Sequence, residues 1–255
     1  MPIYPHNKTN LGNTKNNSGK FKSQPKFLVM HYTAAGSGMA SAKYLFGPHK
    51  PESSAHFVVD RNGDVIQIAD TNLITWHAGR SLWRGISGLN SHAIGVELAN
   101  YGYARKGVSF VSKVRARHKN GGPEQDWETY PEKQVQATIA LAQWIVEKHP
   151  SIREVVGHDD IAPGRKSDPG PAAPMDRFKS VLMPDSDMAP VAKRDKFKVN
   201  ASSLIVRGGP GTQFGKLRSL ETGTIVTVLQ DKGEWSYIED AKGQGWVFDQ
   251  YLSLA

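Results

Sequence analysis

The pattern of apolar residues changes within the chain, and this change limits the folds that it can adopt. Up to residue 182, strand-like apolar runs such as Phe27–His31 alternate with runs of helical period, the clearest of which predicts a helix over Pro131–His149. After residue 197, only short strand-like runs occur, separated by glycine-rich turns. The pattern predicts an α/β domain over residues 27–182, with a mixed central β-sheet flanked by helices, and a small all-β barrel over residues 198–255.

Two segments lie outside these predicted domains. Residues 183–197 contain Pro184, Pro190 and alternating charges without periodicity, and we interpret them as a linker. Residues 1–26 are polar and carry five lysines with no acidic residue, and their composition predicts an unfolded basic tail.

Composition excludes several classes of function. The chain has no cysteine, so disulfides, thiolate ligands, iron–sulfur clusters and a cysteine nucleophile are excluded, and a metal site must use His, Asp or Glu. The formal net charge of +8 favours an anionic partner. No helix–turn–helix, finger or aromatic RNA platform is recognisable, so we expect no nucleic-acid binding. No apolar run reaches the roughly 20 residues that span a bilayer, so we expect no integral membrane association.

The loop that starts at His158 carries the densest set of possible metal ligands. Asp168 follows ten positions later, after a turn forced by Pro163 and Gly164, so the loop can fold its second ligand back beside the first. Together with His31, at the end of a buried strand, these residues could form an open three-ligand zinc site with a fourth position for water. The alternative for His31 is a hydrogen-bonded core histidine.

Five motifs make the first domain resemble the zinc-dependent N-acetylmuramoyl-L-alanine amidases, which share a fold with peptidoglycan recognition proteins. The motifs follow the family's order and spacing; they are Val29–Thr33, Ser54–Phe57, Trp76–Gly79, Ile94–Leu98 and Gly157–Gly170. In particular the chain resembles the branch of anhydro-muropeptide amidases and their envelope relatives, in which aspartate replaces a cysteine ligand. The resemblance implies one Zn²⁺ per chain, held by His31, His158 and Asp168.

The resemblance also assigns the family's catalytic pair to Glu97 and Lys166. Glu97 lies in an otherwise apolar strand, where an unpaired carboxylate is costly, and a carboxylate beside a metal-bound water is suited to act as general base. Lys166, two residues before Asp168, could face a developing oxyanion. The alternatives are a buried ion-pair partner for Glu97 and an ordinary solvated lysine for Lys166; we interpret Arg165 as solvated.

Other residues are assigned to substrate binding or to structure. His77 resembles a family position that lines the substrate groove, or it orients the loop that carries it. Trp83 could stack on a sugar, although a lone tryptophan is more often a packing residue. His56 matches a recurrent family histidine that is structural. The basic insertion at residues 101–127 either contacts the glycan or an acidic polymer, or caps the sheet.

The second domain resembles bacterial SH3 domains. The resemblance rests on the motifs Leu204–Gly211, Gly233–Tyr237 and Gly245–Val247. Ile205 departs from the asparagine usual in that family. The resemblance implies attachment to the cell wall, and the alternative is a domain that only stabilises its neighbour. Trp235 and Trp246 either fill the barrel or line its groove.

Taken together, the resemblances imply a zinc hydrolase that cleaves the amide bond between N-acetylmuramic acid and L-alanine of peptidoglycan or muropeptides, which are its expected partners. The alternative is a non-catalytic peptidoglycan-recognition protein, which the retained ligands and catalytic pair disfavour. Residues 1–26 lack the apolar core of a secretory signal. We therefore expect a protein that stays in the cytoplasm until it is released to the wall, like an endolysin, or that reaches the envelope by a non-classical route. The sequence does not predict the oligomeric state.

Overall fold

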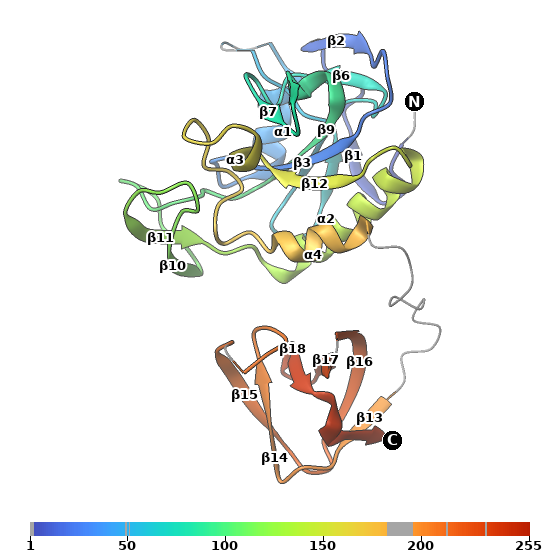
Figure 1. The fold of residues 1–255 in the computed structure, drawn as a ribbon, viewed down its shortest axis with the longest axis vertical. Helices are drawn as coiled ribbons and strands as arrows, with labels where there is room; N and C mark the ends of the chain where they lie inside the picture. Colours follow the sequence, from blue (N-terminus) through green and yellow to red (C-terminus); the bar gives the residue numbers. More distant parts are fainter. Residues whose placement is uncertain (1–2, 49, 51, 183–195, 213, 233) are drawn as a thin grey trace. The chain divides into compact units, whose positions relative to one another are not determined.

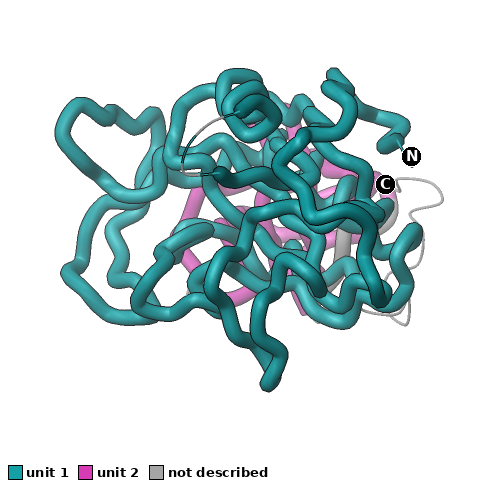
Figure 2. Tube along the Cα trace, turned by 90° about the horizontal axis from the view of Figure 1, so that it is seen from above, with its two compact units in different colours: residues 1–183 teal, residues 184–255 magenta. Residues whose placement is uncertain are grey.

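The structure, a computed structural model, describes residues 3–48, 50, 52–182, 196–212, 214–232 and 234–255. The chain divides into two compact units, Met1–Met183 and Pro184–Ala255 (Figure 2). The predicted linker lies outside the described residues except for its last two positions, which belong to a strand. Among the described residues, no helix is long and apolar enough to cross a membrane.

A six-stranded mixed sheet forms the centre of the first unit (Figure 1). In spatial order its strands are β1 (Asn7–Asn10), β5 (Val65–Gln67), β4 (Phe57–Val59), β9 (Ala93–Leu98), β3 (Phe27–Tyr32) and β12 (Glu154–Gly157). β3 runs parallel to both β9 and β12, whereas β4 and β5 are antiparallel. The continuous apolar run of β3 agrees with its place between two parallel neighbours, where both faces are covered.

Helices cover both faces of this sheet. The helices of the first unit are α1 (Gly38–Phe46), α2 (Glu132–Lys148), α3 (His158–Ile161) and α4 (Met175–Lys179), with 3₁₀ turns at Leu89–His92 and Ser180–Leu182. The sequence prediction of a helix over Pro131–His149 is confirmed: α2 has Pro131 and His149 as its caps. Three short two-stranded ladders complete the unit: β2 (Asn17–Lys20) with β6 (Leu73–Thr75), β7 (Leu82–Trp83) with β8 (Ile86–Ser87), and β10 (Lys113–Arg117) with β11 (Glu124–Glu128).

The alternation of side chains along β3 determines which face carries the polar residues. Leu28 and Met30 join the core cluster beneath α2, whereas Phe27 and Val29 join the cluster that includes α3. His31 continues the second series, so its imidazole lies on the α3 face of the sheet. On the neighbouring strand β9, Glu97 follows the same alternation.

The second unit is all-β and forms a seven-stranded sheet, as predicted for an SH3-like barrel. In chain order its strands are β13 (Lys196–Val199), β14 (Ser203–Arg207), β15 (Lys216–Glu221), β16 (Ile225–Lys232), β17 (Trp235–Asp240), β18 (Gly243–Phe248) and β19 (Leu252–Leu254), with a 3₁₀ turn at Asp249–Tyr251. Its core is a separate cluster of aliphatic side chains that includes Val206, Ile238 and Val247.

The structure contradicts the prediction that residues 1–26 form an unfolded tail. β1 pairs in parallel with β5 at the edge of the central sheet, and β2 pairs with β6. The Tyr4 side chain is only 4% exposed and packs edge-on against Trp144, and its backbone N–H donates to Gln67 Oε1. Asn16 donates its side-chain amide to two backbone carbonyls. Asparagines of this polar segment therefore satisfy backbone groups, and pairing with distant strands fixes the segment.

We expect Tyr4→Ala to lower the free energy of unfolding by about 3 kcal/mol, since it empties a buried aromatic site. Ile3→Ala is the matched control, because Ile3 is 54% exposed and its truncation should change stability by less than about 0.5 kcal/mol. Urea denaturation of both variants measures the difference. Equal stabilities would show that the N-terminal segment does not pack on the sheet in solution.

Candidate metal and catalytic site

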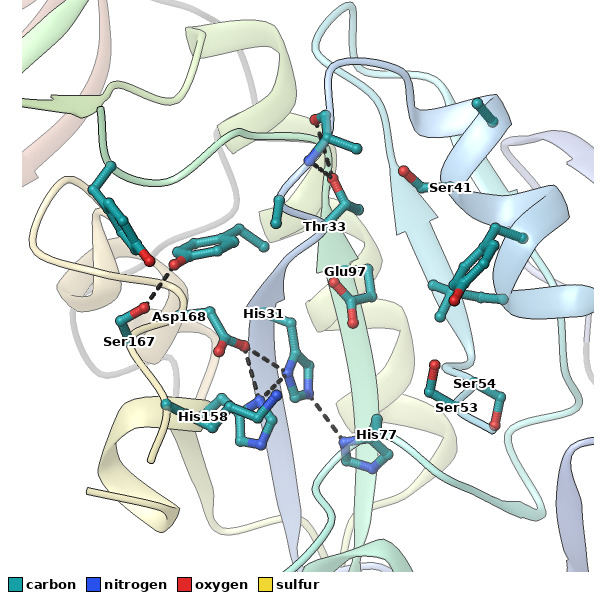
Figure 3. A pocket seen from close by; sticks show the side chains of 18 of the residues that line it. His31, Thr33, Ser41, Ser53, Ser54, His77, Glu97, His158, Ser167 and Asp168 are labelled. Atoms are coloured by element: carbon teal, nitrogen blue, oxygen red, sulfur yellow. Dashed lines mark hydrogen bonds and ion pairs between the residues drawn. The ribbon is translucent and has the colours of Figure 1, made fainter. Parts of the chain in front are cut away.

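Three side chains from separate segments meet at the carboxyl ends of the parallel strands β3 and β12. His31 lies near the end of β3, His158 begins α3 directly after β12, and Asp168 ends the following loop. Their facing atoms are close (Figure 3): the two Nδ1 atoms are 2.9 Å apart, and Asp168 Oδ2 is 3.0 Å from His31 Nδ1 and 2.9 Å from His158 Nδ1. All three residues are buried. The sequence prediction that the loop returns its carboxylate to the histidines is confirmed.

Hydrogen bonds on the far side of each ring determine which ring nitrogens face the cluster. His158 Nε2 lies 3.0 Å from the carbonyl of Ala78, which can only accept, so Nε2 carries the proton. His77 Nε2 lies 3.3 Å from the carbonyl of Ala93, so His77 Nδ1 accepts, and His31 Nε2, 3.0 Å away, donates to it. In the neutral rings, Nδ1 of His31 and Nδ1 of His158 are therefore unprotonated, and each carries a lone pair that faces the cluster.

This donor set fits a divalent metal ion. Two imidazole lone pairs and a carboxylate oxygen face one another in a buried space, and without a cation they would repel. Burial, followed by the neighbouring His158, lowers the pKa of His31 to about 4, so this ring stays neutral, as a metal ligand must be. The three ligand atoms lie within 4.8 Å of one another. Two histidines and one carboxylate are a ligand set of open catalytic metal sites.

Glu97 lies beside His31 in the sheet, and its side chain lines the same cavity. The two residues are paired in the parallel register of β3 and β9, and both line a cavity of about 650 Å³. Glu97 Oε2 is buried and has no hydrogen-bond partner among the described residues. Burial and the charge of Asp168 raise the pKa of Glu97 well above its usual range, with Lys166 opposing them. A carboxyl group in this setting is suited to proton transfer.

Lys166 reaches the same cavity from the loop between His158 and Asp168. One turn within this loop and one contact with the sheet hold the loop in place. The Lys166 backbone N–H donates to Ala162, and the hydroxyl of Tyr32, at the end of β3, lies 2.7 Å from Ser167 Oγ. The cavity therefore brings together all five residues that the sequence assigned to metal binding and catalysis.

The structure places His77 behind His31. The side chain lines the cavity but is only 7% exposed, and both ring nitrogens are hydrogen-bonded. Gly95 of β9 provides the room, because a Cβ at that position would lie 2.5 Å from the His77 ring. This arrangement favours an orienting role for His77 over direct binding of substrate.

The structure does not bring Trp83 into this cavity. Its indole packs beside the α3 cluster, donates to Glu154 Oε2 at 3.1 Å and lies under the Arg84 guanidinium. His56 is fully buried, and its ring is hydrogen-bonded to the backbone of Leu73 and Gly95, as expected for a structural histidine.

Sequence analysis missed the role of Arg165. Its Nη2 donates to the carbonyls of Ala78 and Arg80, at 2.8 and 2.7 Å. The first of these carbonyls also accepts from His158, so Arg165 ties the loop after β6 to the loop that carries Lys166 and Asp168. No local signal in the sequence identifies this contact, because its partners are backbone atoms more than eighty residues away.

Two family models match the chain. Residues 21–171, more than half of the chain, match the family described as N-acetylmuramoyl-L-alanine amidase. Residues 202–253 match the family described as bacterial SH3 domain. The two matches lie in the first and second compact units, respectively.

Similar proteins include two curated amidases. N-acetylmuramoyl-L-alanine amidase AmiD of Escherichia coli is 34% identical over 158 residues, which is 58% of this chain and 50% of that protein. 1,6-anhydro-N-acetylmuramyl-L-alanine amidase AmpD of Enterobacter cloacae is 31% identical over 135 residues, which is 52% of this chain and 59% of that protein. The matched region thus spans between half and three fifths of the length of these relatives.

Two solved structures share the fold of the first unit. A selenomethionine derivative of AmpD superposes with a TM-score of 0.54 at 21% identity, covering 71% of this chain and 97% of that one. AmiD from E. coli, solved with the substrate anhydro-N-acetylmuramic acid-L-Ala-D-gamma-Glu-L-Lys, superposes with a TM-score of 0.50 at 31% identity, covering 66% of this chain and 61% of that one.

The contact between His77 and His31 leads to a prediction about metal affinity. We expect His77→Ala to weaken the binding of a divalent metal ion about 10–100-fold, since His31 loses the acceptor that fixes its tautomer and ring orientation. His77→Asn, which keeps an acceptor oxygen near the position of Nδ1, should retain more of the affinity. Competition with a chromophoric chelator measures both constants. Unchanged affinity in His77→Ala, together with a raised KM, would instead assign His77 to substrate binding.

Proposed function

The chain belongs to the N-acetylmuramoyl-L-alanine amidase family, and on that premise we propose that it hydrolyses the amide bond between N-acetylmuramic acid and L-alanine in peptidoglycan or muropeptides. The observation that carries the proposal is the convergence of the ligand cluster with Glu97 and Lys166 on one cavity of about 650 Å³. The names of the relatives and the substrate bound to E. coli AmiD support this choice of bond. Retention of the complete cluster argues against the alternative, a peptidoglycan-recognition protein without activity.

The proposal includes one Zn²⁺ per chain, held by His31, His158 and Asp168. The two Nδ1 lone pairs and the carboxylate oxygen support this choice, because Zn²⁺ accepts nitrogen and oxygen ligands in a tetrahedral arrangement with one open position. When bound, zinc polarises the scissile carbonyl and lowers the pKa of a coordinated water.

The protein's own groups supply the proton transfers and part of the charge stabilisation. The Glu97 carboxylate takes a proton from the attacking water and returns it to the nitrogen of the leaving alanine. The Lys166 ammonium faces the carbonyl oxygen and stabilises the negative charge that develops there. His77 and the carbonyl of Ala78 hold the two ligand rings in place, so that these groups keep their positions during the reaction. The products are a muramic acid unit and a stem peptide with a free amino group.

We assign attachment to the cell wall to the second unit, which makes the cell envelope the site of action. The match to bacterial SH3 domains supports this assignment. Trp246 is buried in the barrel, where it packs beside Tyr237. Trp235 is partly exposed, and together with Phe248 and Tyr251 it lines a cavity of about 310 Å³ with a mainly apolar wall.

We expect the wild type to release alanine amino termini from purified sacculi without releasing reducing sugar ends.

Glu97→Gln should lower kcat by about 10²–10⁴ and Lys166→Ala by about 10²–10³, with zinc still bound, because neither side chain is a ligand. Asp168→Ala should lose most of its zinc, since only two protein ligands remain. Metal analysis alongside kinetics distinguishes these cases.

Three results would contradict these proposals. Stoichiometric zinc in Asp168→Ala would exclude Asp168 as a ligand. Turnover close to wild type in Glu97→Gln would exclude Glu97 as the base. Release of reducing ends by the wild type would identify a glycosidase and exclude the proposed reaction.

Deletion of residues 198–255 tests the assignment of the second unit. All proposed catalytic residues lie in the first unit, which has its own core, so hydrolysis of small soluble muropeptides should remain close to that of the full chain. Binding and hydrolysis of sacculi should fall, because a tethered second site raises the effective concentration of enzyme on a polymer. Co-sedimentation and amine release measure the two effects. An equal loss of activity on both substrates would mean that the second unit only stabilises the first.

A further inference from the structure

The insertion between β9 and α2 contains a hairpin, β10–β11, whose charged residues are balanced between its two strands. On one face, β10 and β11 oppose cations and anions in register, and Arg115 forms ion pairs with Glu124 and Asp126. On the other face lie Val114, Ala116, Gln125 and Trp127, which alternate with the charged residues. The ladder is therefore not an exposed basic patch that would attract an acidic polymer.

The loop that follows β10 is fixed to α3, the helix that begins with the ligand His158. His118 accepts from the backbone N–H of Asn120 at Nδ1, so its Nε2 donates to Asp159 Oδ2, 3.0 Å away. Lys119 Nζ lies 2.8 Å from Asp159 Oδ1 and 2.7 Å from Asp160 Oδ1. Asp159 is 2% exposed, so these are contacts of a buried carboxylate. The hairpin therefore has a defined position relative to the metal ligands.

A second cavity of about 300 Å³ lies between this hairpin and the loop that carries Lys166. We call it the hairpin chamber. It adjoins the catalytic cavity, because Tyr103, Arg165, Lys166 and Ser167 line both. On the hairpin side its wall is formed by residues 118 and 120–123 together with Gln125 and Trp127. A substrate bound over Lys166 can thus extend from one cavity into the other.

The chemistry of the chamber wall favours a neutral, polar ligand with an apolar face. None of the described residues that line it is acidic, and its polar groups include the amide of Gln125 and the side-chain oxygen of Asn120, whose Nδ2 donates to the backbone carbonyl of Asp159. Arg165 donates through Nη2 to two backbone carbonyls, and Lys166 is assigned to the carbonyl oxygen of the substrate. Among the described residues, the hairpin side of the wall carries no Asp, Glu, Lys or Arg. Tyr103, half-buried and edge-on to Trp127, adds an aromatic surface. Amides that pair with hydroxyls, beside an aromatic ring that packs on C–H groups, are suited to a saccharide.

The position of the chamber agrees with this chemistry. Glu97, which serves the leaving nitrogen, lines only the catalytic cavity, whereas Lys166, which faces the carbonyl oxygen, lines both. The part of the substrate attached to the carbonyl carbon therefore lies on the chamber side. Given the proposed function, on which this inference rests, that part is the muramic acid and the glycan beyond it. We propose that the hairpin chamber is a saccharide subsite that binds the glycan side of the substrate.

Gln125→Trp tests this proposal in the full chain, because the larger side chain fills the chamber from β11. We expect kcat/KM to fall by about tenfold or more on substrates with a disaccharide, and by less on substrates with one sugar and the same peptide. The penalty should not depend on peptide length. Gln125→Ala, which adds no bulk, should show the same ranking with smaller losses. The control is Glu124→Gln, since this side chain faces away from the chamber, is 57% exposed and should leave all rates unchanged.

Binding of a peptide-free disaccharide of N-acetylglucosamine and N-acetylmuramic acid provides a readout that does not need catalysis. Isothermal titration calorimetry should detect binding to wild type and to Glu124→Gln, and about tenfold weaker binding to Gln125→Trp. If the chain hydrolyses no muropeptide but this pattern is observed, the proposed reaction fails and the saccharide subsite stands. A Gln125→Trp penalty that follows peptide length would make the chamber a peptide subsite and overturn the proposal. So would equal binding and kinetics in wild type and Gln125→Trp.

Discussion

The first unit depends on one arrangement, in which two imidazole lone pairs and a carboxylate face one another in a buried space. Such groups are costly to bury together unless a cation lies among them. The surrounding structure holds them there nonetheless. Parallel pairing of β3 with β12 brings His31 and His158 to the same edge of the sheet, and two backbone carbonyls, one of them acting through His77, fix their tautomers. The orientation of the cluster is thus set in part by groups that do not belong to it.

Local sequence patterns predicted the elements of this site because its parts are locally encoded. The apolar runs of β3 and β9 and the helical period of α2 each reflect burial on one side of a single element, and a charged residue inside such a run is conspicuous. The resemblance carried by the ordered motifs then implied the ligand set. The role of His77 could not be found this way, since its partner His31 is 46 residues away in the sequence. The role of Arg165 was missed for the same reason, because its partners Ala78 and Arg80 are also distant in the sequence.

In the N-terminal segment, by contrast, the local composition gave a wrong prediction. Its composition is that of a disordered chain, yet Tyr4 and Asn7 share Gln67 Oε1 as an acceptor and β1 extends the central sheet. A few long-range hydrogen bonds and one buried ring outweigh the low hydrophobicity. The five lysines of residues 1–26 nevertheless remain exposed, with no acidic residue in the segment. An ordered segment therefore presents positive charge, whereas the β10–β11 ladder, which seemed basic in linear sequence, pairs much of its charge with the opposite strand.

The loop from His158 to Asp168 contributes both to the proposed reaction and to the proposed binding of the glycan. Within four residues it supplies Arg165, which ties the loop after β6, then Lys166, then Ser167, which contacts Tyr32, and finally the ligand Asp168. The same loop separates the catalytic cavity from the hairpin chamber. The contacts of the hairpin with Asp159, directly after His158, link the chamber wall to the proposed metal ligands. The hairpin can therefore differ in sequence without changing the ligands, provided that this contact is kept. Such a division would allow one metal centre to act on glycans of different length, because the reacting groups and the groups that contact the glycan lie on separate elements.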